Sequence, residues 1–205
     1  MSETNETLND ALEIDVNFSR SKRVRIPEFI IYTGPMFGTK TTRMLIELDR
    51  ALYRGQSVVA CKPIVDGRYA EAEIVTHGGL RFPAINVMEA WQLQKIALEH
   101  DVIGVDEAFM IDGCADVLIE LYKEGKTVVV SSVQLSAQGQ PFDEVVRMMP
   151  WATRIEVCPA VCPLTGLDAY FTVRRDGGGT EIEVGGADLY EPRAWGHTPF
   201  TGRKF

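Results

Sequence analysis

A glycine-rich turn between an apolar run and an amphipathic helix constrains the fold of this chain more than any other feature. The run 29–33 is continuously apolar and is typical of a buried strand. Residues Thr41–Tyr53 follow the turn and predict a helix, because apolar side chains recur at helical spacing at Met44, Leu45, Leu48 and Leu52. A strand, a tight turn and a helix in this order predict a nucleotide-binding α/β unit.

The turn itself has the composition of a phosphate-binding loop. It consists of Gly34, Pro35, Met36, Phe37, Gly38, Thr39, Lys40 and Thr41. Such a loop directs backbone N–H groups and a helix N-terminus at a polyphosphate, so we expect Lys40 to reach the outer phosphates and the Thr41 hydroxyl to bind magnesium. The alternative is an ordinary glycine turn that joins a strand to a helix.

Thr39 departs from the usual phosphate-loop pattern, which has glycine at this position. If the position requires a positive φ or a close approach to phosphate, a β-branched residue there costs about 1–3 kcal/mol in strain. We therefore expect a strained backbone at Thr39.

A second apolar run, 101–106, ends in two adjacent carboxylates, Asp106 and Glu107. The carboxyl end of a strand in a parallel sheet is where ligands bind. We expect Asp106 to contact magnesium, and Glu107 to accept a proton from a substrate hydroxyl as this hydroxyl attacks the γ-phosphate. The alternative is an acidic cap on the turn that follows the strand.

The rest of the chain alternates strand and helix patterns. Strands are predicted at 57–61 and 127–131, and helices at 87–100 and 114–121. This alternation predicts an α/β fold with a parallel sheet covered by helices on both faces. We divide the chain into a flexible acidic tail and lead-in (1–27), a nucleotide-binding core (28–152) and a small hairpin-containing subdomain (153–205).

The charge and hydropathy exclude two classes of function. The formal net charge is -8, which argues against nucleic-acid binding, because that affinity comes largely from lysine and arginine. No apolar stretch has the length of a membrane span, and the N-terminus has no secretory signal pattern. We expect a cytoplasmic protein, in the host cytoplasm if the chain is viral, that binds no membrane.

Several short motifs occur in the order found in cellular-type thymidine kinases. They are the loop 34–41, Lys62-Pro63 with Asp66 and Arg68, Val105-Asp106-Glu107, Pro141-Phe142, the segment 160–162 and the segment 185–190. From about Ile30 to Tyr190 the chain therefore resembles this family. The resemblance implies transfer of the ATP γ-phosphate to the 5′-hydroxyl of thymidine, with Mg²⁺, on a RecA-like core with a small lasso subdomain, as a homo-oligomer that is usually a tetramer.

The same resemblance assigns roles to individual residues. Asp66 and Arg68 correspond to a pair near the phosphates. The nucleoside would contact Met36, Phe142, Thr172, Glu183 and Tyr190, with Thr172 facing the base and the stretch 181–190 gripping it.

The chain also departs from the family pattern. Phe109 stands where the family has a glutamine two residues after the catalytic glutamate. Of the structural zinc site only Cys162 and His197 remain, with Thr165 and Ala194 at ligand positions, so bound zinc is not expected. Cys158 is the one substitute ligand that could complete a three-residue set.

Two other functions remain open from the sequence. A nucleotide-binding homologue without kinase turnover would explain the departures at Thr39, Phe109 and the zinc site. A RecA-like ATPase without a nucleoside substrate would need only the loop and the carboxylates.

Overall fold

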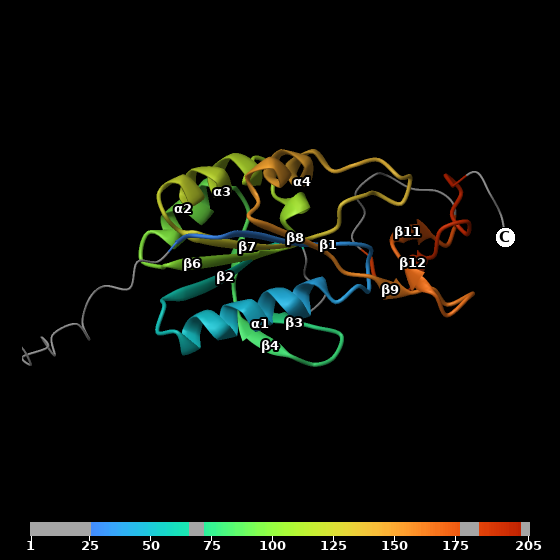
Figure 1. The fold of residues 1–205 in the computed structure, drawn as a ribbon, viewed down its shortest axis with the longest axis horizontal. Helices are drawn as coiled ribbons and strands as arrows, with labels where there is room; N and C mark the ends of the chain where they lie inside the picture. Colours follow the sequence, from blue (N-terminus) through green and yellow to red (C-terminus); the bar gives the residue numbers. More distant parts are fainter. Residues whose placement is uncertain (1–25, 66–71, 177–184, 202–205) are drawn as a thin grey trace, which may run out of the picture.

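The computed structural model describes residues 26–65, 72–176 and 185–201 (Figure 1). Its centre is a sheet of six parallel strands in the order β5-β2-β6-β7-β1-β8. In this order the strands are β5 (Ile85–Val87), β2 (Val58–Pro63), β6 (Val102–Asp106), β7 (Thr127–Ser132), β1 (Phe29–Thr33) and β8 (Arg154–Val157).

Helices cover both faces of the sheet. Figure 1 shows α2 (Trp91–Ala97), α3 (Cys114–Lys123) and α4 (Asp143–Met148) on one face. The other face carries α1 (Lys40–Tyr53) and the hairpin of β3 (Glu73–Val75) and β4 (Arg81–Pro83). The prediction of an α/β fold with a parallel sheet covered by helices on both faces is confirmed.

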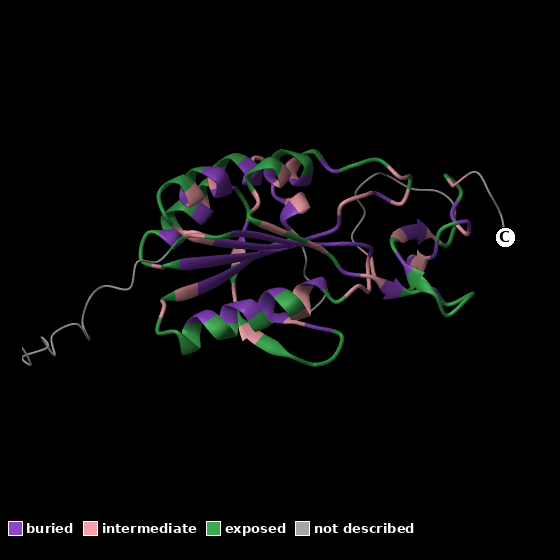
Figure 2. Ribbon diagram, in the orientation of Figure 1, coloured by how far each residue is buried: buried purple, intermediate pink, exposed green. Residues whose placement is uncertain are grey.

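The central strands are buried over their whole length, as their continuous apolar sequences predict. Every residue of β1 and β6 is buried (Figure 2), which is the pattern of a parallel sheet covered on both sides. Helix α1 packs closely here: a Cβ at Gly104 in β6 would lie 2.6 Å from Leu48 Cδ1. Glycine at this position therefore lets α1 approach the sheet.

Two helix predictions need adjustment. The helix expected over 87–100 is shorter, because Val87 belongs to β5 and the side chain of Gln92 accepts the N–H groups of Met88 and Glu89 before α2 begins. In α1, Leu52 was expected on the apolar face, yet its side chain is exposed and Ala51 is buried in its place.

Strand β8 corrects the assignment of residues 154–157 to the small subdomain. Its residues pair with β1 in parallel, from Ile30 opposite Arg154 to Thr33 opposite Val157. The main sheet therefore continues to Val157. Only long-range pairing reveals this, because the short alternating segment Arg-Ile-Glu-Val is compatible with a strand in either part.

Beyond β8, short antiparallel pairs build the smaller part of the molecule. Strands β9 (Ala160–Val161) and β10 (Asp168–Ala169) form one pair, and β11 (Phe171–Arg174) and β12 (Tyr190–Arg193) form the other. The predicted hairpin character is confirmed. Within the described part of the chain, the helices are all too short or too polar to cross a bilayer.

Candidate active site

The loop between β1 and α1 contains a strained residue, but this residue is Phe37 rather than Thr39. Phe37 has φ 65° and Gly34 has φ 138°, whereas Thr39 has φ -82° and ψ 23°, which any residue adopts. The expectation of strain at Thr39 is therefore wrong. A non-glycine residue in the left-handed region costs of order 1 kcal/mol and persists only where its surroundings hold it.

Two contacts hold Phe37 in this conformation. Its side chain packs against the small apolar cluster of Ala160, Cys162, Ala169 and Ala194 in the smaller part of the molecule. Its ring also lies 5.4 Å from the ring of His77, in the turn between β3 and β4. The phosphate loop is thus supported from both sides by segments distant in sequence.

The two glycines of the loop are required because the loop crosses the backbone of Cys158. A Cβ at Gly34 would lie 2.3 Å from the Cys158 carbonyl oxygen, and one at Gly38 would lie 2.5 Å from the same atom. The Cys158 N–H donates to the Thr33 carbonyl at 2.7 Å, which fixes this crossing. Gly38 therefore serves close packing, one position before the glycine of the usual pattern.

Lys40 lies at the start of α1 and is almost completely buried. Its Nζ donates a 2.6 Å hydrogen bond to the Pro35 carbonyl across the loop. The ammonium group is thus folded over the loop in which a polyphosphate would be cradled, which is where the sequence predicts a phosphate contact.

A hydroxyl and a carboxylate meet at the base of the loop. The Thr41 hydroxyl donates to Asp106 Oδ1 at 3.0 Å, and it lies 3.3 Å from the hydroxyl of Ser131, at the end of β7. Hydroxyl and carboxylate oxygens are the donors that magnesium prefers. The chemistry of these two predicted magnesium ligands therefore fits the ion, and β6, β7 and α1 bring them together.

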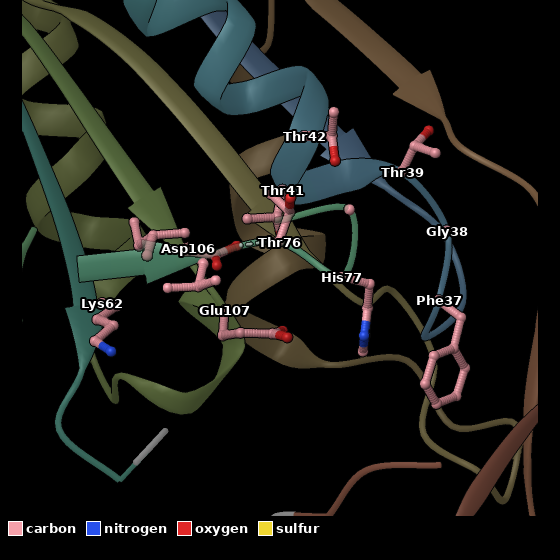
Figure 3. A pocket seen from close by; sticks show the side chains of 13 residues that line it. Phe37, Gly38, Thr39, Thr41, Thr42, Lys62, Thr76, His77, Asp106 and Glu107 are labelled. Atoms are coloured by element: carbon pink, nitrogen blue, oxygen red, sulfur yellow. Dashed lines mark hydrogen bonds between the residues drawn. The ribbon is translucent and has the colours of Figure 1, made fainter. Parts of the chain in front are cut away.

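Glu107 follows directly on β6 in a left-handed conformation, with φ 48° and ψ 43°. The turn changes the direction of the chain before the short helix η2 (Ala108–Met110). The carboxylates of Asp106 and Glu107 therefore point in different directions. In Figure 3, Asp106 lies beside Thr41, whereas the Glu107 carboxylate points toward the space bordered by Phe37 and His77. Such local strain is typical of functional sites.

These groups line a cavity of about 260 Å³. Its lining comes from the phosphate loop and α1, from the ends of β2 and β6, and from the β3–β4 hairpin: Phe37, Gly38, Thr39, Thr41, Thr42, Lys62, Ile74, Val75, Thr76, His77, Gly78, Asp106 and Glu107. Figure 3 shows them around the open space. The cavity therefore joins the predicted phosphate loop to the predicted base.

Two lining residues, Lys62 and His77, received no role from the sequence. Lys62 is buried at the end of β2, beside the strand that ends in Asp106. The sequence could have indicated Lys62, because it directly follows the predicted strand 57–61, where a parallel sheet binds ligands. His77 gave no signal, because only the fold of the β3–β4 hairpin brings it to Phe37.

An apolar cluster connects the phosphate loop with η2 and α4. Phe142 and Phe109 have ring centroids 4.5 Å apart, and Met36 packs with them against Val133 and Val145. The Phe109 side chain is thus part of this apolar cluster. The backbone N–H of Phe109 donates to the Ser132 hydroxyl at 3.2 Å. The cluster brings the predicted nucleoside contacts Met36 and Phe142 to one place.

Thr172 reaches the same place from β11. Its hydroxyl accepts the Met36 N–H at 2.9 Å. Tyr190, opposite Arg174 in the β11–β12 pair, is buried. Three other predicted residues, Asp66, Arg68 and Glu183, lie outside the described residues.

The remnant zinc ligands do not form a metal-binding set. Cys162 is buried among alanines, one of which is Ala194 at a former ligand position. Within 26–65, 72–176 and 185–201 no group of three His, Cys, Asp or Glu side chains comes together, so Cys158, Cys162 and His197 are not gathered around one point. The residues present do not fit tetrahedral zinc.

Hydrogen bonds to the Cys162 thiol favour its thiolate form, which is the form that binds metals. Burial raises its pKa, but a hydrogen bond from the Thr165 side chain and backbone hydrogen bonds from Ala194, Leu164 and Thr165 outweigh burial and lower the pKa to about 7. By contrast, burial alone raises the pKa of Cys61 to about 12, as expected of a thiol in the core.

Comparison with known proteins gives a family and a close relative. A family model for thymidine kinase matches residues 28–197. A thymidine kinase from Pyrobaculum aerophilum is 32% identical over 180 residues, which cover 82% of this chain and 96% of that protein. The family match spans the phosphate loop, the Asp106-Glu107 turn and most of the smaller part.

Solved structures give weaker likenesses. A DNA replication initiation factor has a TM-score of 0.39 at 15% identity, over 65% of this chain and 40% of that one. AMPPCP-bound DnaA from Aquifex aeolicus has a TM-score of 0.38 at 16% identity, over 65% of this chain and 41% of that one. The chain therefore spans about two fifths of the length of these structures.

Proposed function

The chain belongs to the thymidine kinase family, and on this premise we propose that it transfers the γ-phosphate of ATP to the 5′-hydroxyl of thymidine. The observation that carries the proposal is the hydrogen bond between Thr41 and Asp106, 3.0 Å long, in a cavity that Glu107 also lines. It joins a phosphate loop to a carboxylate pair, the two parts that phosphoryl transfer needs.

The loop would hold the triphosphate. Backbone N–H groups from Phe37 to Thr41 and the N-terminus of α1 supply partial positive charge, and Lys40 would exchange its bond to the Pro35 carbonyl for a phosphate oxygen. Because the backbone of the loop and of α1 is fixed before the substrate binds, its N–H groups stabilise the charge of the transition state with little reorganisation, whereas Lys40 changes its partner.

Glu107 would act as the general base. Its left-handed backbone places its carboxylate apart from Asp106 and on the cavity wall. From there it would accept the proton of the nucleoside 5′-hydroxyl during attack on the γ-phosphate. Asp106 stays with Thr41, so the two carboxylates would have separate roles.

Thr41 and Asp106 would hold magnesium, and their oxygen donors fit it. When bound, the ion neutralises phosphate charge and orients the transferring group. The protein's part is to keep the two oxygens together, which the packing of α1 on β6 and β7 achieves.

The nucleoside would bind beside this site. Met36, Phe109 and Phe142 belong to one apolar cluster, of the kind that packs against a planar base. Thr172 and the turn 185–190 lie on the lasso side, where Gly186 accepts the N–H groups of Leu189 and Tyr190. Asp66 and Arg68 are proposed near the phosphates and Glu183 near the base, by resemblance alone.

Assembly and location follow the family expectation. We propose a homo-oligomer, a tetramer by resemblance, that works in the cytoplasm without bound nucleic acid, and the net charge of -8 supports the last point. Structural zinc is not part of the proposal, because Ala194 and Thr165 occupy ligand positions.

One assay tests the proposed reaction. Purified chain, labelled ATP and Mg²⁺ are incubated with thymidine, and the nucleotide product is counted for wild type, Lys40→Ala and the exposed-lysine control Lys95→Ala. We expect transfer by wild type and by the control, and a loss of roughly 10²–10³-fold in kcat for Lys40→Ala. ATP binding without phosphate transfer to thymidine would favour a nucleotide-binding homologue without kinase turnover. ATP hydrolysis at a rate that does not depend on thymidine would favour a RecA-like ATPase.

A further inference from the structure

We propose that Phe200 is a positioning residue for the nucleoside site, because it fixes the loop 135–141 to strand β11. This inference rests on the proposed function, since it assigns Phe200 an effect on nucleoside binding.

The ring of Phe200 lies between two segments that are far apart in sequence. Its centroid is 5.4 Å from that of Phe171 in an edge-to-face arrangement at 72°. On the other side, a Cβ at Gly139 would lie 3.1 Å from Phe200 Cγ, so the ring packs on the bare backbone of Gly139, which has φ 79°. Figure 1 shows the loop between β7 and α4 reaching the C-terminal segment beside β11 and β12.

A network of hydroxyl groups holds Phe200 in this place. Thr198 is buried, and its hydroxyl donates to the Thr201 hydroxyl at 2.8 Å and accepts the Thr201 N–H at 3.1 Å. The Gly196 N–H donates to the same Thr201 hydroxyl at 3.1 Å. Thr198 and Thr201, which flank Phe200 in the sequence, are thus held by hydrogen bonds, and the Phe200 ring has a fixed position. A shift of one segment that contacts the ring would therefore also shift the other.

The loop that Phe200 touches is itself closed. The Ser136 N–H donates to the Gln140 carbonyl at 2.8 Å, the Gly139 N–H donates to the Ser136 carbonyl at 3.0 Å, and the buried Ser136 hydroxyl accepts the Gln140 N–H at 3.2 Å. Leu135 and Pro141 form a bridge across its base. A shift of the tip at Gly139 would therefore move the whole loop.

Both ends of this contact lead to the proposed base site. The loop continues into Phe142, whose N–H donates to the Gln134 carbonyl at 3.2 Å and whose ring packs on Phe109. On the other side, Phe171 precedes Thr172, which accepts the Met36 N–H. Phe200 thus sets the spacing between the Phe142 wall and the Thr172 wall, and its connection to the phosphate loop runs through the Met36–Thr172 hydrogen bond.

The test compares Phe200→Ala with Phe200→Tyr, which keeps the ring, and with Tyr53→Ala, which removes an exposed aromatic side chain at the far end of α1. Steady-state kinetics give KM for thymidine and for ATP. Hydrogen exchange reports separately on the Gly139 and Gln140 amides.

We expect Phe200→Ala to raise KM for thymidine roughly tenfold, the size of one lost aromatic contact, with KM for ATP within about twofold of wild type. The Gly139 and Gln140 amides should exchange faster, and both controls should behave as wild type.

An equal rise in both KM values, or an unchanged KM for thymidine, would overturn the proposal. Unchanged exchange at the loop would also overturn it, whatever the kinetics. A wild-type chain that transfers phosphate to no nucleoside would instead refute the proposed function, and the exchange data would still decide whether Phe200 fixes the loop.

Discussion

The N–H of Met36 donates to the hydroxyl of Thr172 at 2.9 Å, across 136 positions of sequence. Met36 lies in the phosphate loop and Thr172 lies in the second strand pair of the smaller part. The bond joins the loop that would hold ATP to the segment that would grip the nucleoside. The relative placement of the two substrates therefore depends on it.

Replacement of Thr172 by valine should uncouple these two parts. Valine keeps the shape but leaves the Met36 N–H without its acceptor, which costs about 1 kcal/mol in unfolding free energy and moves the loop relative to the lasso. We expect KM for thymidine to rise and kcat to fall. Urea unfolding measures the change in unfolding free energy, and steady-state kinetics measure KM and kcat. Thr172→Ser, which keeps the hydroxyl, should retain most of the activity. Equal behaviour of the two variants would contradict this account.

Replacement of Glu107 by glutamine should abolish turnover without loss of stability. Glutamine has the same backbone conformational cost at φ 48°, so the melting temperature should not change, while loss of the base should lower kcat roughly 10²–10⁴-fold. Glu120→Gln on the exposed face of α3 is the matched control. A variant that keeps most of its kcat would show that another group accepts the proton.

Glycine at position 39 should bring no benefit, in contrast to the expectation from sequence. Because Thr39 already has φ -82°, Thr39→Gly relieves no strain and should change the unfolding free energy by only about 0.3 kcal/mol. Gly38→Ala should instead cost about 1–3 kcal/mol, because its Cβ would meet the Cys158 carbonyl at 2.5 Å. Denaturant unfolding of the two variants checks this, and a clear gain in stability for Thr39→Gly would refute the assignment of the strained position to Phe37.

Chelation of metal should leave the fold intact. The Cys162 side chain packs with Ala160, Ala169 and Ala194, so apolar contact stabilises this part of the molecule. We expect the melting temperature without magnesium to be the same with and without EDTA, and elemental analysis to find zinc far below one atom per chain. Stoichiometric zinc together with a lower melting temperature after chelation would show that bound zinc stabilises the fold, contrary to this prediction.

The nature of the site could be predicted from sequence because its signals are local. A buried apolar strand, a glycine turn and a helix occupy 25 consecutive positions from Phe29 to Tyr53, and the carboxylates directly follow another such strand. In a parallel sheet the carboxyl ends of strands lie at one edge, so Thr41 and Asp106 were expected at the same edge, and the strand order then brings them to 3.0 Å.

The sequence by itself therefore determined the α/β class, the phosphate loop and the acidic strand end, since each depends on the preferences of adjacent residues. Only the tertiary structure decided that Phe37 has the left-handed backbone, that β8 extends the main sheet, and that Phe200 packs between Phe171 and Gly139. These features depend on which distant segments pack together, and the pairing of distant segments leaves no periodic signal in the local sequence.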